Sequence, residues 1–176
     1  MRTTSTIGHK VSLSLLRSDL HLLVAIYLSS QPIAAIADID TTRDASVWKI
    51  EDCEQEGITR LIISTSINIR VLDDQEENKL GMFSIYCGTL TKDIEKPTES
   101  VEGLTLREAC NKVIHAVTVD FDHGKLKTGG TFLHPFLYLR GRDQRHRTWE
   151  ANLNVVQFVR EALNAIAYLQ GQIRAA

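Results

Sequence analysis

The sequence predicts an α+β fold that is mainly α: a helical bundle with a small three-stranded antiparallel sheet, built on a hairpin, inserted before the C-terminal helix. Apolar side chains recur at steps of three and four residues in 58–72 and in 155–167, which indicates two amphipathic helices. Apolar and polar residues alternate in 117–121, 132–141 and 148–153, which indicates three strands. The 176 residues suit one domain, with residues 1–10 as a loose Thr/Ser-rich tail.

Two helices are expected in the first half of the chain. Residues 12–30 form the first, which Pro32 ends because proline lacks the N–H that continues a helix. Asp44 caps the second, which runs from Ala45 to about Leu72, and Gly57 is the residue at which it can bend or split. Its expected buried face consists of Trp48, Ile58, Leu61, Ile62, Thr65, Ile69 and Leu72.

The middle of the chain carries weaker signals. The acidic "DDQEENK" (73–79) is typical of a solvated helix end or loop. "MFSIYCGTL" (82–90) fits either a short strand or a buried helical turn, and "TKDIEKPTESVEG" (91–103) resembles an exposed connection.

The second half begins with a capping box, Thr105-x-x-Glu108, which predicts a helix to about Ala116. A strand over 117–121, the turn segment 122–130 and a strand over 132–141 follow, with Pro135 near the start of the latter. The hairpin tip 142–147 leads to a strand over 148–153. Asn154 then caps a final helix over 155–169.

The cysteines and the most apolar segment indicate the cellular compartment that we expect for the protein. Cys53, Cys87 and Cys110 form no CxxC pair, so they are expected to be reduced thiols of a cytoplasmic protein and not a disulfide framework or a zinc site. The most apolar window, 20–37, is interrupted by His21 and by Ser-Ser-Gln-Pro. We therefore expect no membrane segment, because a span needs about 20 apolar residues.

Charge is divided unequally along a chain whose net charge is −2. Residues 1–102 hold ten Lys and Arg against sixteen Asp and Glu, whereas residues 103–176 hold ten against six. Such polarity fits a basic face for a polyanion, or two faces that attract each other across a homodimer.

The strongest candidate for chemistry is a polar row on the predicted helix 105–116. Arg107, Asn111 and His115 follow each other at steps of four and therefore share one stripe. His115 could transfer a proton, Arg107 could hold a phosphate and Asn111 could orient the imidazole. The structural alternative is that Asn111 and His115 bond backbone groups where the helix meets the sheet.

The segment "LREACNKVIHA" resembles the signature helix of HEPN-domain proteins, and "NKVIH" matches the part of the pattern from the polar residue to the histidine. The resemblance implies a helical bundle, a homodimer with facing motif helices, and metal-independent RNase activity in toxin–antitoxin or anti-phage systems. The family arginine stands directly before the polar residue, where this chain has Cys110. Arg107, one turn earlier, would have to replace it, which puts catalysis in doubt.

A second candidate is the basic hairpin tip. Arg140, Arg142, Arg145 and Arg147 lie within eight residues, and Lys125 and Lys127 lie in the preceding turn, so these six side chains are predicted to bind nucleic acid. Alternatively, the tip is a solvated turn, or it makes charged contacts with the acidic segment 73–78.

Asp120, Asp122 and His123 could share a divalent ion, but the sequence has no second ligand cluster to complete the site. We therefore expect a polar strand edge there, and neither a metal nor a cofactor.

Two functional hypotheses follow: an RNA-binding protein or endoribonuclease with His115, Arg107 and Asn111 as its site, or a catalytically inactive module for dimerisation or binding to a protein partner.

Overall fold

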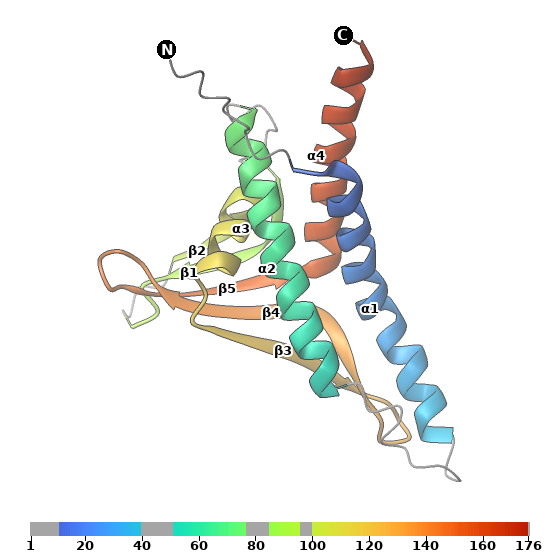
Figure 1. Cartoon of the computed structure of the whole chain (residues 1–176). Helices are drawn as coiled ribbons and strands as arrows, with labels where there is room; N and C mark the ends of the chain where they lie inside the picture. Colours follow the sequence, from blue (N-terminus) through green and yellow to red (C-terminus); the bar gives the residue numbers. More distant parts are fainter. Residues whose placement is uncertain (1–10, 40–50, 77–84, 96–99, 176) are drawn as a thin grey trace, which may run out of the picture.

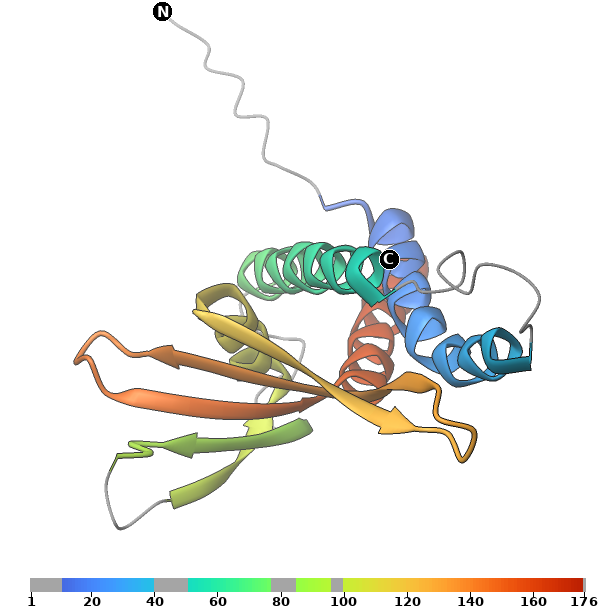
Figure 2. The same ribbon diagram turned by 90° about the horizontal axis from the view of Figure 1, so that it is seen from below.

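Five antiparallel strands form one sheet, and the helices pack on one of its faces (Figures 1 and 2). The computed structural model describes residues 11–39, 51–76, 85–95 and 100–175. The elements, in chain order, are α1 (Leu13–Ile39), α2 (Glu51–Gln75), β1 (Tyr86–Lys92), β2 (Ser100–Thr105), α3 (Leu106–His115), β3 (Thr118–Lys125), β4 (Thr131–Arg142), β5 (Thr148–Asn154) and α4 (Val155–Ala175).

The strand order is β2-β1-β5-β4-β3. The hairpin β1–β2 and the meander β3–β4–β5 are joined where β1 pairs with β5, with Leu90 opposite Ala151. On the other side of β5, Leu139 of β4 lies opposite Ala151 and Leu137 lies opposite Leu153. Because directly opposed residues point to the same face, this register gathers the apolar side chains on the side of the sheet that meets the helices.

The core lies between this face and the helices. Its strand residues include Leu90, Leu137, Leu139, Trp149, Ala151 and Leu153, and its helix residues include Leu16, Leu20, Leu23, Ile58, Ile62, Leu106, Val113 and Phe158. The opposite face of the sheet carries none of the helices of the described residues (Figure 2).

Both helix caps predicted for the second half are confirmed. Thr105 Oγ1 accepts the N–H of Glu108 (3.2 Å) at the start of α3, and Asn154 Oδ1 accepts the N–H of Gln157 (2.9 Å) at the start of α4. The predicted strand face of Trp149, Ala151 and Leu153 is buried, as expected from its alternation.

The prediction that Pro32 ends the first helix is wrong, because α1 continues to Ile39. Pro32 lies on the exposed side, where water can bind the carbonyl of Leu28 that loses its N–H partner. Before Pro32, the hydroxyl of Ser30 accepts the backbone N–H of Leu133 in β4 (2.8 Å), which fastens this part of α1 to the sheet.

The predicted apolar face of the second helix is confirmed from Ile58 to Leu72, and Gly57 does not divide the helix. The expected cap Asp44 and the expected core residue Trp48 lie outside the described residues. The helix continues into the acidic segment as far as Gln75, so the expectation that residues 73–75 are solvated is wrong for Asp73, which is completely buried.

The predicted fold class is corrected in two respects. The sheet has five strands instead of three, and it forms one layer under the helices instead of an insertion into a helical bundle. The two additional strands lack a clear period of two. A bulge in β1 separates its buried residues Cys87 and Leu90 by three positions, and in β2, at the sheet edge, only Leu104 is buried.

Candidate functional site

The polar row lies on α3, which packs against α2 and the sheet. Arg107 forms ion pairs with the buried carboxylate of Asp73 and with Asp74 (Nη2 to Oδ1, 2.9 Å), both near the end of α2. Burial and the neighbouring Arg70 lower the pKa of Arg107, but a guanidinium stays protonated at neutral pH. Two carboxylates thus already hold the arginine that was predicted to grip a phosphate.

The other two members of the row have separate surroundings. Asn111 Nδ2 donates to Glu108 Oε2 on the same helix (3.2 Å), and not to a backbone group. Burial pushes the pKa of Glu108 up, but this bond and the charge of Lys112 hold it below the usual value. His115 is exposed at the end of α3, about 12 Å along the helix axis from Arg107. The structure therefore does not bring the three side chains together at one point.

The helix end at His115 rests closely on the sheet. Its carbonyl oxygen lies over Gly141 of β4, where a Cβ atom would be only 2.9 Å away, so only glycine fits there without displacement. One turn earlier, Lys112 Nζ lies 4.4 Å from the centre of the Trp149 ring, a cation–π contact. These contacts fix the C-terminal half of α3 on β4 and β5.

Cys110 points into the core and is completely buried. Burial, with the nearby Cys87, raises the pKa of its thiol well above the usual range. The residue at the position of the HEPN arginine therefore faces the interior, away from the surface on which His115 is exposed.

Asp143 organises the hairpin tip. In the sequence it is only one acidic residue among several arginines. Its carboxylate accepts the backbone N–H groups of Arg145 (2.8 Å) and Arg147 (3.0 Å) and the Nε of Arg147 (2.7 Å). Burial acts to raise its pKa, but these bonds and the charge of Arg147 hold the value below normal. His146 adopts a positive φ of 60° in this turn.

Two of the four arginines predicted to bind nucleic acid are neutralised locally. Arg140 pairs with Glu150 (2.7 Å) and Asp120 (3.2 Å) across neighbouring strands, and Arg147 pairs with Asp143 and Asp93. The alternative contact of the tip with the acidic segment is not found in its described part, residues 73–76, where Asp73 and Asp74 pair with Arg107 and Arg70 instead.

Arg142 and Arg145 differ from these two. Both are exposed, and within the described part of the chain no ion pair to either of them is found.

Lys127 lies in the turn between β3 and β4, as predicted, whereas Lys125 is the last residue of β3 and not part of the turn; both are exposed. This turn lies at the opposite end of β4 from the tip, and a strand of 12 residues spans about 35 Å. The lysines and the arginines therefore do not form one continuous basic surface.

The acidic strand edge is irregular. A shift in pairing between Phe121 and His123 interrupts the alternation after Asp120, and Asp120 pairs with Arg140. Among the described residues, no group of three or more His, Cys, Asp or Glu side chains is placed to hold a metal ion.

Sequence reasoning missed an apolar stripe on α1, formed by Leu15, Leu22 and Ile36, which are 67%, 51% and 53% exposed. Leu28 is also 65% exposed, but it lies at least about 120° around the helix from Leu15 and Leu22 and is not part of this stripe. Residues 13–37 of α1 are long and apolar enough to cross a membrane, with a mean hydropathy of 1.6. In the folded chain, however, the other side of the helix enters the core through Leu16, Leu20 and Leu23. The signal that could have found the stripe is the spacing of seven between Leu15 and Leu22.

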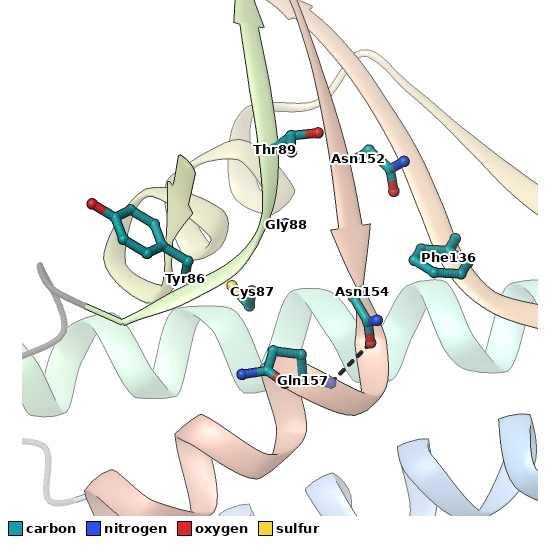
Figure 3. A pocket seen from close by; sticks show the side chains of 8 residues that line it. All are labelled: Tyr86, Cys87, Gly88, Thr89, Phe136, Asn152, Asn154 and Gln157. Carbon is teal, nitrogen blue, oxygen red and sulfur yellow. Dashed lines mark hydrogen bonds between the residues drawn. The ribbon is translucent and has the colours of Figure 1, made fainter. Parts of the chain in front are cut away.

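A pocket of about 300 Å³ was also missed. It opens where the uncovered face of the sheet meets the start of α4 (Figure 3). Its lining consists of Tyr86, Cys87, Gly88, Thr89, Phe136, Asn152, Asn154 and Gln157. A second hollow of about 420 Å³ lies along α2 beside Ile63 and Ile67.

No signal in the sequence could have located the pocket of Figure 3, because it depends on the pairing of β1 with β5.

The resemblance of α3 to the HEPN signature stays a prediction that rests on the segment from Asn111 to His115. Comparison of the chain with models of protein families, with curated proteins and with solved structures finds no match.

Proposed function

We propose that the chain is a catalytically inactive interaction module that forms a homodimer through the apolar stripe of α1. The observation that carries this proposal is the exposure of Leu15, Leu22 and Ile36 along one side of the helix. Large exposed apolar side chains that follow one side of a helix are typical of a contact site with another helix.

A second copy of the chain is the partner that suits the stripe best. Leu15, Leu22 and Ile36 fall on a seven-residue repeat, with Ser29 at the intermediate position, which is the spacing of a helix that packs against another helix. Ser18 and Ala25, both exposed between these positions, would allow close approach. None of these residues carries a charge, so two copies related by a two-fold axis would not repel each other.

The state of the polar row favours a module over an enzyme. A phosphate would have to displace Asp73 and Asp74 from Arg107, and Cys110 offers a buried thiol where the HEPN pattern has an arginine. Transition-state stabilisation needs a charge that is already aimed at the reacting group. Here the charge of Arg107 is aimed at two carboxylates.

Dimerisation is tested with the double variant Leu15→Gln/Leu22→Gln, studied by sedimentation velocity over a concentration series. Glutamine keeps a high helix propensity, so the fold should be retained while four apolar contacts per dimer are lost. We expect the wild type to sediment at twice its chain mass of 19.8 kDa and the variant to dissociate at concentrations at least about 100-fold higher.

The matched control is Val117→Gln, because Val117 is 78% exposed but lies away from α1. Its dimer should be unchanged. A wild type that stays monomeric, or a double variant that dimerises normally, would contradict the proposal. If the wild type is monomeric and floats together with phospholipid vesicles, the stripe binds a membrane instead.

RNA binding or cleavage is the second candidate function, and the exposure of Arg142, Arg145 and His115 supports it. Two arginines without an ion pair among the described residues can contact phosphates at the hairpin tip, and each contact adds a salt-dependent, sequence-independent increment to affinity. His115 is exposed and could transfer a proton.

This candidate is tested with labelled single-stranded RNA in EDTA. We expect Arg142→Ala/Arg145→Ala to weaken binding and to reduce the slope of log affinity against log salt by about 1.4. Lys125→Ala/Lys127→Ala removes the same charge at the other end of β4 and should change the affinity less. Cleavage that is lost in His115→Ala but kept in Cys110→Ala would establish an RNase. Absence of both binding and cleavage would reject this candidate without affecting the dimer.

A further inference from the structure

The pocket on the uncovered sheet face is built by three separate parts of the chain. Tyr86 and Thr89 of β1 bound one side, Phe136 of β4 bounds the other, and Asn152 of β5 lies between them (Figure 3). The first turn of α4 closes one end with Gln157. A volume of about 300 Å³ is at the lower end of the range for small-molecule sites.

Gly88 lets the two strands beside the pocket approach closely. A Cβ atom on Gly88 would collide with the backbone carbonyl of Asn152 on the neighbouring strand. With no side chain there, β1 and β5 pack together without displacement. The walls of the pocket therefore stand on regular, closely paired elements.

The polar groups of the pocket have defined roles. Asn154 Oδ1 accepts the N–H of Gln157 (2.9 Å), which fixes the amide so that its Nδ2 is left as a donor. Gln157 Nε2 donates to Glu161 Oε1 (2.9 Å), which commits that amide nitrogen to α4. In contrast, the Oδ1 atom of Asn152 is buried and accepts no hydrogen bond from the described residues. An unpaired buried acceptor is unfavourable, so a hydrogen bond donated by a ligand would be favourable there.

The lining also restricts the charge of a ligand. None of the eight lining side chains is a carboxylate, an amine, a guanidinium or an imidazole. The buried thiol of Cys87, whose pKa is raised to about 12 by burial and then by Glu161, stays protonated at neutral pH. The site therefore suits a neutral group. The ring of Phe136 offers one aromatic face to a flat ring, whose edge can meet the side-chain amide of Asn152, whereas the ring of Tyr86 lies on the other side of β1, against Gly103 of β2 (Figure 3).

We propose that this pocket binds a nucleobase-type heterocycle, a neutral planar ring whose edge presents both N–H donors and an acceptor. Side-chain amides recognise such edges by paired hydrogen bonds, and aromatic side chains supply stacking surfaces. The ring can belong to a free nucleoside or to a base of single-stranded RNA. The site is separate from α1, so the inference does not depend on the homodimer, and it does not require cleavage.

The test is isothermal titration of the full chain with each of the four ribonucleosides and, separately, with ten-nucleotide homopolymers of RNA. We expect at least one nucleoside or homopolymer to bind, with affinity at least about 10-fold weaker in Asn152→Leu and in Phe136→Leu. Thr118→Ala, on β3 outside the pocket, should bind normally. Nucleoside binding identifies a small-molecule site, whereas binding of the homopolymer alone identifies a base site for RNA.

Asn152→Leu has a second readout that shows whether the variant is folded. Because it removes an unpaired buried polar group, its Tm should rise by about 3 °C while its affinity falls. If neither the four ribonucleosides nor the RNA homopolymers bind, the proposal is overturned. Wild-type affinity in both Asn152→Leu and Phe136→Leu would also overturn it, even if RNA binds elsewhere on the chain through Arg142 and Arg145.

Discussion

Replacing Cys110 by arginine, which restores the residue that the HEPN pattern has before Asn111, is expected to unfold the protein instead of activating it. Cys110 is fully buried on the inner side of α3. A guanidinium there would lose its hydration, and the effective penalty for a buried ion is several kcal/mol. Its bulk would also overpack a filled core. Since domains of this kind are stable by about 5–15 kcal/mol, most of the stability would be lost.

Urea denaturation followed by circular dichroism measures this loss. His115→Arg is the matched control, because it introduces the same side chain at an exposed position of the same helix and should leave the midpoint within experimental error. Cys110→Ala should cost only about 1 kcal/mol, since it removes one small atom from the core. A Cys110→Arg protein with native stability that cleaves RNA would instead show that α3 can turn this position towards the surface.

Local signals in the sequence were sufficient for the parts of the fold that depend on neighbours along the chain. Thr105 and Asn154 cap helices as their residue types predict, because a cap involves only the next three residues. The apolar face of α2 from Ile58 to Leu72 is predicted by apolar residues that recur every three or four positions, a pattern that is visible in the sequence alone.

The sheet could not be predicted to the same degree, because its central pairing joins distant segments. Leu90 of β1 lies opposite Ala151 of β5, about 60 positions later in the chain. β2 buries only one residue, Leu104. Its sequence therefore lacks the alternation of apolar and polar residues that would indicate a strand. Without those two strands, the expected sheet is too small to cover the helices, so the sequence favours a helical bundle.

The candidate site shows the same division between local and distant information. Helical spacing placed Arg107 and His115 on one stripe, but it could not reveal that α2 would bring two carboxylates to the arginine. One signal was available. Asp73 stands four residues after Ile69 and therefore on the buried face of α2, where a carboxylate needs a cationic partner.

Arg107→Met is therefore expected to lower the free energy of unfolding by about 3 kcal/mol, because it leaves the buried carboxylate of Asp73 without its main partner. Arg70, whose Nη1 lies 3.5 Å from Asp73 Oδ2, is more distant and already contacts Asp74, so it can compensate only in part. Methionine keeps the length of the apolar stem, which limits the change to the loss of the charge and its hydrogen bonds.

A double-mutant cycle with Asp73→Asn separates this structural role from a catalytic one. If the guanidinium serves Asp73, the double variant should be clearly more stable than the sum of the two single losses predicts, with a coupling energy of about 1–3 kcal/mol. Arg142→Met, at an exposed arginine, should change stability by less than about 0.5 kcal/mol. An Arg107→Met protein that is as stable as the wild type would mean that the pair with Asp73 contributes little. Arg107 would then be available to a phosphate, which would favour an RNase site on α3.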